Sequence, residues 1–264
     1  NVLKNATGYN LTQLMIGSEG TLGIITKIVF KLIPLPTKDI SMLIPFKSSE
    51  MACKAVSAVF RAGLHPSALE FMERDAIDWT LKYTDAKINN LTNDVQAHLL
   101  IEVDGNDIEL LYKDCEKIAD VLSEFDCGEI LIADSKSQKD QLWNIRRRVS
   151  EAVKANSVYK EEDTVVPRAE LPLLLKGVKQ IGKKYGFKSV CYGHAGDGNL
   201  HVNIIKGQMN EVNWNKNIKK GIREIFEFTK KLGGTISGEH GIGLVQKDYL
   251  DIVFCQKIIE IQKS

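Results

Sequence analysis

Alternating strand and helix patterns run through most of this chain, and they limit its possible folds more than any other feature. Apolar residues repeat with period two near 39–46, 67–72, 97–104 and 128–134, and with helical spacing over 49–62, 73–83 and 107–124. Alternation on this scale favours split βαβ units in an antiparallel sheet with helices on one face. We therefore expect an α+β fold of the ferredoxin-like kind.

The second half of the chain continues this pattern. A helix is expected to begin at about Ser137, which stands three residues before Asp140 as in a capping box, and to run through residue 156. A helix near 170–186, a hairpin near 189–206 and a long helix near 212–232 follow. The dipeptide Asp197-Gly198 is a favoured two-residue turn for that hairpin.

The first 36 residues differ from the rest. A glycine-rich stretch, GSEGTLG from Gly17 to Gly23, precedes a strand-like run from Ile24 to Ile33, and prolines at 34 and 36 end that run. The stretch lacks the Gly-Lys-Ser/Thr of a P-loop and leads into a strand rather than a helix, so it meets neither nucleotide-binding fingerprint. We predict two units, 1–36 and 37–264.

Charge and cysteine content narrow the class of protein. Thirty-five basic and 34 acidic residues nearly cancel, which argues against a broad interface with nucleic acid. Five cysteines without a CxxC pair indicate free thiols in a reducing compartment. No apolar run approaches the roughly 20 residues of a membrane span. The chain starts in mid-motif and stops in mid-helix, so we expect it to be part of a longer protein.

Histidines gather in two glycine-rich segments, YGHAGDGNLHVN and GGTISGEHGIG. A turn at Asp197-Gly198 would place His194 directly opposite His201, with Cβ atoms about 4.5–5.5 Å apart and Asn203 on the same face. Glu239 could add a carboxylate, and two histidines with one carboxylate suit catalytic Zn²⁺, Fe²⁺ or Mn²⁺. The alternative is a structural hairpin with two exposed histidines.

A basic helix offers a second candidate site. Arg146 and Ser150 lie one helical turn apart, so a guanidinium and a hydroxyl share one side and could hold a carboxylate. Lys160, at the start of the next strand, could be a second cation. A solvated basic face and a surface lysine are the alternatives.

Six segments in order carry a resemblance to a known family. TGYNLTQLMIGSEGTLGIIT is followed by SALEFMERDAI, LWNIRRRVSEA, VYKEEDTVVPRAEL, YGHAGDGNLHVN and GTISGEHGIG. Together they resemble the flavoproteins that include glycolate oxidase subunits, D-lactate dehydrogenases and D-2-hydroxyglutarate dehydrogenases. The resemblance implies the last strands of a vanillyl-alcohol-oxidase-type FAD domain followed by a C-terminal cap domain.

The resemblance also implies roles for single residues. FAD contacts fall on Thr7, Gly17, Glu19, Gly20, Thr21, Gly23, Ile24 and Ile25. Metal ligands fall on His194, His201 and Glu239, and the catalytic base is His240. Substrate contacts fall on Arg146, Ser150, Lys160 and Asn203. Ser150 stands where the family often has threonine, and the family's closing Asp-Pro and Asn-Pro-Gly-Lys segment is absent.

The implied activity is FAD-dependent oxidation of a D-2-hydroxy acid, such as D-lactate, glycolate or D-2-hydroxyglutarate, to the 2-oxo acid. A divalent metal, Zn²⁺ first and then Fe²⁺ or Mn²⁺, and an unidentified electron acceptor complete the expected partners. We expect a cytoplasmic location or the inner face of the membrane, leave a homodimer open, and expect no turnover from this chain alone. A metal-dependent hydrolase and a non-catalytic metal-binding module are the alternatives.

Overall fold

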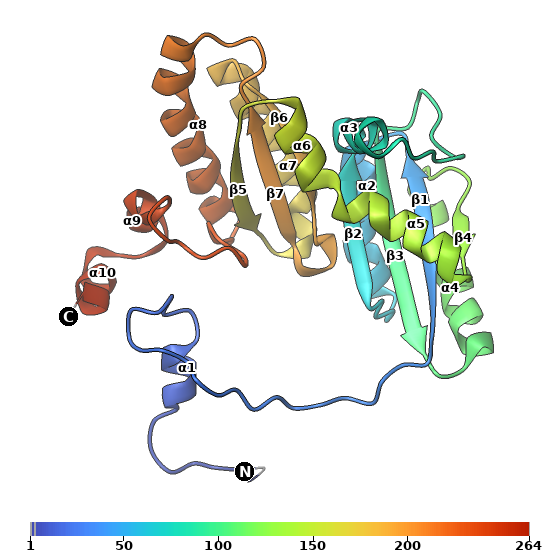
Figure 1. Cartoon of the computed structure of the whole chain (residues 1–264), viewed down its shortest axis with the longest axis horizontal. Coiled ribbons are helices and arrows are strands. Elements are labelled where there is room, and N and C mark those ends of the chain that lie inside the picture. Colours follow the sequence, from blue (N-terminus) through green and yellow to red (C-terminus); the bar gives the residue numbers. More distant parts are fainter. Residues whose placement is uncertain (1, 3, 264) are drawn as a thin grey trace.

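The computed structural model describes residue 2 and residues 4–263, and these form one twisted antiparallel sheet with helices packed on it (Figure 1). The seven strands have the order β4-β1-β3-β2-β6-β7-β5. Their bounds are β1 (Lys38–Phe46), β2 (Ala68–Glu73), β3 (Ala97–Gly105), β4 (Leu131–Ala133), β5 (Tyr159–Val165), β6 (Lys188–Gly193) and β7 (Asn199–Ile205). The expected α+β class and antiparallel sheet are confirmed.

Two split βαβ units make up the sheet. In the first, α2 (Ser49–Arg61) connects β1 to β2, and β3 pairs antiparallel with both. In the second, α7 (Leu171–Tyr185) connects β5 to β6, and β7 lies between them. Only two residue pairs of the described chain, Phe71 with Gly193 and Met72 with Tyr192, join the units along β2 and β6. We call this join the seam.

Helices cover both faces of the sheet, whereas the sequence predicted one covered face. One face carries α2, α7, α4 (Ile108–Ser123) and α8 (Glu211–Lys231), and the other carries α3 (Arg74–Thr84), α5 (Lys136–Arg147) and α6 (Val149–Asn156). The reason lies in strand β1, where Met42 and Leu43 point to opposite faces and are both buried. Helices α3, α5 and α6 cover mainly the first unit (Figure 1). Away from these helices, the same face of β7 and β5 carries polar side chains, among them His201, Asn203 and Asp163.

The basic helix is shorter and earlier than predicted. Its N-cap is Ser135 rather than Ser137, because Ser135 forms the complete capping box with Gln138. Arg148 ends α5 and precedes α6, so the expected single helix is two. Arg146 therefore lies in the last turn of α5 and Ser150 in the first turn of α6.

The N-terminal segment forms α1 (Leu11–Met15) and otherwise extended chain. The predicted strand from Ile24 to Ile33 is wrong in this structure, because the run has no strand beside it in the described chain and its apolar side chains are exposed. Glu19 of the N-terminal segment contacts the backbone of Ile242 and Gly243, which precede the C-terminal helices α9 (Leu250–Val253) and α10 (Gln256–Lys263) (Figure 1). Among residues 4–263 we find no helix whose length and apolar content would let it cross a bilayer.

Candidate metal and substrate site

The hairpin that carries two of the histidines has a different register from the predicted one. Tyr192, not His194, lies opposite His201, because a short 3-10 turn, η2 (Ala195–Asp197), replaces the two-residue turn. The register is therefore shifted by two residues, which leaves side chains on the same face. His194 and His201 still meet, with ring centroids 5.6 Å apart.

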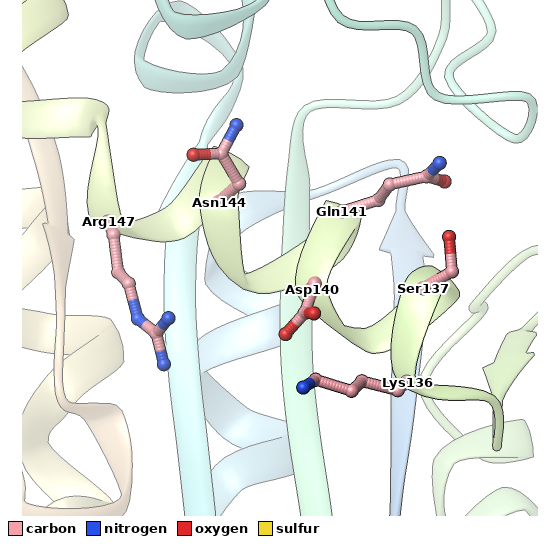
Figure 2. Close-up of a pocket in the computed structure, with 6 residues that line it drawn as sticks. All are labelled: Lys136, Ser137, Asp140, Gln141, Asn144 and Arg147. Carbon is pink, nitrogen blue, oxygen red and sulfur yellow. The ribbon is translucent and has the colours of Figure 1, made fainter.

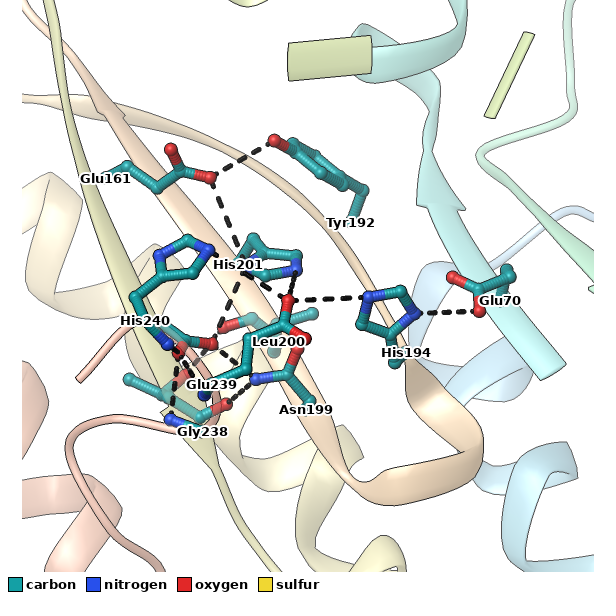
Figure 3. A network of polar contacts seen from close by, with 12 residues as sticks. Glu70, Glu161, Tyr192, His194, Asn199, Leu200, His201, Gly238, Glu239 and His240 are labelled. Atoms are coloured by element: carbon teal, nitrogen blue, oxygen red, sulfur yellow. Dashed lines mark hydrogen bonds and ion pairs between the residues drawn. The ribbon is translucent and has the colours of Figure 1, made fainter. Parts of the chain in front are cut away.

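Glu239 reaches both imidazoles. Its Oε1 atom lies 3.5 Å from His194 Nε2 and 3.5 Å from His201 Nε2 (Figure 3). Two ligand atoms on one tetrahedral ion are about 3.3–3.5 Å apart when each is about 2.0–2.2 Å from the metal. The ligand atoms of these three residues all lie within 4.8 Å of one another. The donor set and its spacing thus fit one divalent cation.

Glu70, which the sequence interpretation missed, supports this group from the neighbouring β2 strand. Its Oε1 accepts from His194 Nδ1 at 2.8 Å, so Nε2 of that ring is left for a metal (Figure 3). Its Oε2 accepts from Arg146 Nε at 2.8 Å, and Arg146 Nη2 is in ion-pair contact with the same oxygen at 2.8 Å. Glu70 therefore joins the basic helix to the histidine pair across the seam.

Burial and charge set the protonation of the two histidines. Burial lowers the pKa of His201 to about 4, and the charge of Asp163, which acts in the opposite direction, does not compensate. The hydrogen bond to Glu70 raises the pKa of His194 above its usual value. His201 is therefore neutral at pH 7, the form in which an imidazole binds metal.

Asp163, on β5, holds the loop that carries Glu239 and was also missed. Its Oδ2 accepts from the backbone N–H groups of Gly238, Glu239 and His240 at 2.9, 2.7 and 3.0 Å. Burial alone would raise the pKa of Asp163, but these backbone hydrogen bonds, with one from Asn199, hold it below its usual range. A charged, fully buried carboxylate thus fixes one end of the 238–243 loop.

His240, the predicted catalytic base, lies over the metal group. Its ring stacks on that of His201, with centroids 5.3 Å apart and planes 21° apart. Its Nε2 is 3.9 Å from Glu239 Oε1, and about half of its side-chain surface is exposed. The ring is therefore open to a proton donor from outside the chain.

Three of the four predicted substrate residues, Arg146, Ser150 and Asn203, lie close to the Tyr192 ring. Arg146 lies over that ring, with its Cζ 5.2 Å from the centroid. Burial raises the pKa of Tyr192 to about 12. The polar side chains of Ser150 and Asn203 nearby act in the opposite direction and lower it. Asn203 is fully buried, and both its amide atoms lack a hydrogen-bond partner within the described chain. Buried polar groups left unpaired in this way indicate a missing ligand or water.

Lys160 does not share this face. It lies opposite Ile204 in the ladder, and Ile204 packs in the core on the other side of the sheet. Its neighbour Glu161 points to the face of the sheet that carries the histidines and lies opposite Asn203. Its carboxylate accepts a hydrogen bond from the Tyr192 hydroxyl at 3.2 Å. Lys160 and Glu161 lie on opposite faces because successive side chains of a strand alternate. Lys160 nevertheless lines a hollow of about 440 Å³ together with Glu161 and His240, and its predicted substrate contact stays a prediction.

A hollow of about 780 Å³ lies elsewhere. Figure 2 shows it along the exposed side of α5, where it is lined by Lys136, Ser137, Asp140, Gln141, Asn144 and Arg147. Its lining is polar and solvent-exposed, and it contains none of the histidines. The histidine group therefore lies apart from this hollow.

The predicted FAD segment is open except at one residue. Gly17 and Gly20 have φ of +80° and +78°, and a Cβ at either would meet no atom within 4 Å. Ile24 and Ile25 are exposed. Glu19, in contrast, is engaged: its carboxylate accepts from the backbone N–H groups of Ile242 and Gly243 at 2.7 and 2.8 Å. Exposed backbone and apolar side chains in this segment fit a large planar cofactor, but the Glu19 carboxylate is already bound.

Comparison with known proteins places this site in a family. Residues 35–261 match the family model described as FAD linked oxidases, C-terminal domain. The chain is 37% identical to a D-lactate dehydrogenase of Anaerostipes hadrus, over 94% of this chain and 53% of that protein. It is 34% identical to the glycolate oxidase subunit GlcD of Bacillus subtilis, over 99% of this chain and 55% of that protein. The chain thus spans about half the length of these relatives.

Solved structures share the fold at lower identity. A 4-ethylphenol oxidase from Gulosibacter chungangensis matches with a TM-score of 0.62 and 13% identity, over 88% of this chain and 51% of that one. An alkyldihydroxyacetonephosphate synthase matches with a TM-score of 0.61 and 19% identity, over 88% and 46%. By its family model, relatives and fold, this chain belongs to the FAD linked oxidases and carries their C-terminal domain.

Proposed function

We propose that this chain supplies the metal, substrate and proton-transfer residues of an FAD-dependent dehydrogenase that oxidises a D-2-hydroxy acid to a 2-oxo acid. The observation that carries the proposal is the convergence of His194, His201 and Glu239 beside a buried, unpaired amide at Asn203. A relative named D-lactate dehydrogenase and one named as a glycolate oxidase subunit support a small hydroxy acid as substrate.

The substrate carboxylate has three matching groups. Arg146 Nη2 is buried and makes no hydrogen bond of its own, although it stays in ion-pair contact with Glu70. Asn203 offers an amide donor, and the Ser150 hydroxyl lies near the same tyrosine ring. A guanidinium with neutral donors beside it binds a carboxylate in a fixed orientation. That orientation selects one enantiomer.

His240 removes the proton from the substrate C2 hydroxyl in this proposal. Its ring stacks on that of His201 and about half of its side chain is exposed, so it lies beside the ligand group and is open to a substrate. A divalent cation held by His194, His201 and Glu239 would supply positive charge that lowers the pKa of the hydroxyl. Zn²⁺ suits this nitrogen and oxygen donor set first, and Fe²⁺ or Mn²⁺ are the other options.

FAD would supply the hydride acceptor, held in part by backbone of the 17–25 segment. We propose that residues 1–36 belong to the FAD domain and that residues 37–264 form the substrate and metal domain. The electron acceptor for the flavin, a location in the cytoplasm or at the inner face of the membrane, and a homodimer remain parts of the same proposal.

The metal site is tested on the chain itself. Isothermal titration with Zn²⁺ should give one strong site in the wild type, a loss of about 100-fold or more in His201→Ala, and little change in His240→Ala. Equal affinity in the wild type and His201→Ala would contradict the ligand set.

The redox activity is tested in a protein that joins this chain to an FAD domain. Its flavin should bleach anaerobically with D-lactate, glycolate or D-2-hydroxyglutarate, and His240→Ala should slow the bleaching while metal content stays the same. A metal-loaded flavoprotein that none of these acids bleaches would contradict the proposed reaction and favour a metal-binding module without this chemistry.

A further inference from the structure

Two carboxylates far apart in sequence, those of Glu19 and Asp163, hold the 238–243 loop. Asp163 binds the backbone N–H groups of residues 238, 239 and 240, and Glu19 binds those of residues 242 and 243. The loop is thus fixed on both sides of its middle residue, Gly241. Hydrogen bonds to charged groups are about twice as strong as neutral ones, so these five contacts define the loop conformation.

The backbone has positive φ on both sides of the contact between Glu19 and the 238–243 loop. Glu19 itself has φ of +50°, an unusual value for a residue with a side chain. Gly241 has φ of +77°, and a Cβ there would lie 2.9 Å from Glu19 Oε1. A side chain at 241 would therefore displace the carboxylate. Glycine at this position allows the close approach.

We propose that Glu19 is a positioning residue that sets the Glu239 and His240 side chains relative to the 17–23 segment. This inference rests on the proposed function, in which Glu239 binds the metal, His240 is the base, and the 17–23 segment lies at the flavin. Glu19 and Ile242 are 223 residues apart in sequence, and their hydrogen bond joins the two segments directly. The Glu19 side chain thus serves the metal loop rather than the cofactor, in contrast to its predicted role.

The consequence is a coupling between two binding sites. A loop with two free N–H groups has more conformations, so Glu239 spends less time beside His194 and His201. Loss of one charge-assisted hydrogen bond corresponds to roughly a tenfold change in an equilibrium constant. Because Glu19 is solvent-exposed, we expect a smaller loss of metal affinity, about three- to tenfold.

The experiment compares the wild-type chain with Glu19→Gln and with Glu116→Gln, which neutralises an exposed glutamate on α4 far from the loop. Amide hydrogen exchange is measured for residues 238–243, and Co²⁺ binding is followed by its visible absorption. In Glu19→Gln the amides of residues 242 and 243 should exchange at least about tenfold faster. Co²⁺ affinity should fall about three- to tenfold with an altered spectrum, and Glu116→Gln should match the wild type.

Each other outcome contradicts a defined part of the inference. Unchanged exchange at residues 242 and 243 in Glu19→Gln would show that the contact is not made. Faster exchange with wild-type Co²⁺ affinity and spectrum would keep the contact but refute the positioning role. A wild-type chain that binds no Co²⁺ would refute the proposed metal site and the positioning role with it, while exchange would still report the contact.

Discussion

Glu70 gives the sharpest test of the site, because one carboxylate supports both the metal ligand and the substrate cation. Its side chain is 7% exposed, and its two oxygens bind His194 and Arg146 at 2.8 Å each. Glu70→Gln keeps the shape but removes the charge. Breaking a buried ion pair from one side costs about 3–5 kcal/mol, because the other charge stays buried without compensation. For a domain of this size that lowers Tm by about 6–20 °C.

The same substitution should weaken metal binding. Loss of a carboxylate behind a metal-binding histidine typically costs about 10–100-fold in affinity. We expect Zn²⁺ titration of Glu70→Gln to show a loss in that range, measured well below the Tm of the variant. The double variant Glu70→Gln/Arg146→Met, which also removes the buried cation, should recover much of the stability but not the metal affinity.

Glu73 provides the matched control on the same strand. It forms a comparable ion pair with Lys179 at 2.7 Å, with a side chain 13% exposed, but away from the histidines. Glu73→Gln should therefore lower Tm without changing Zn²⁺ affinity. Wild-type Zn²⁺ affinity in Glu70→Gln, or an equal loss in both variants, would refute the role given to Glu70.

Three further predictions concern stability and the 238–243 loop. Burial lowers the pKa of His98 and of His201 to about 4, below the unfolded value of about 6.5, so the unfolded chain binds protons first as pH falls. In urea melts the free energy of unfolding should fall below pH 6.5 by up to about 1.4 kcal/mol per pH unit for each histidine. His98→Gln should remove the contribution of His98, and a pH dependence equal to that of the wild type would contradict this. Gly198→Ala should cost about 3 kcal/mol or more in thermal melts, because φ is +75° and the Cβ would lie 2.0 Å from the Val166 carbonyl oxygen; a wild-type Tm would contradict it. Asp163→Asn should speed amide exchange in the 238–243 loop and lower Zn²⁺ affinity. Unchanged exchange would show that Asp163 does not hold this loop.

The fold was predictable where its signal is local. Period-two and helical spacing gave the order of strands and helices, and the end of each element lies within a few residues of its prediction for most of the chain. The prediction of a strand from Ile24 to Ile33 failed. An alternating pattern shows that a segment can pair as a strand, but not that a partner strand lies beside it. The second layer of helices was not predicted. Strand β1 is apolar on both faces, and a strand of this kind needs helices on both sides of the sheet.

The site was predictable in part. His194 and His201 were expected to meet through the turn between them, and they do despite a register shifted by two residues. Glu70 and Asp163 could not be found in this way, because their partners lie 124 and about 76 residues away and sequence spacing carries no information about such contacts. The face of Lys160 depends on the exact register of its strand, because only every second residue of a strand faces one side, and spacing in sequence did not fix that register.

The seam has a consequence for how this molecule assembles. Glu70 belongs to the first split βαβ unit and His194 to the second, and in the described chain two ladder pairs join β2 to β6. His194, His201 and Glu239 all belong to the second unit, so a metal can bind before the two half-sheets dock. Full affinity, which the Glu70 carboxylate behind His194 supports, would arise only after docking, so the affinity for a metal during refolding would report that event. A spectroscopically visible ion such as Co²⁺ would make that event observable without any label.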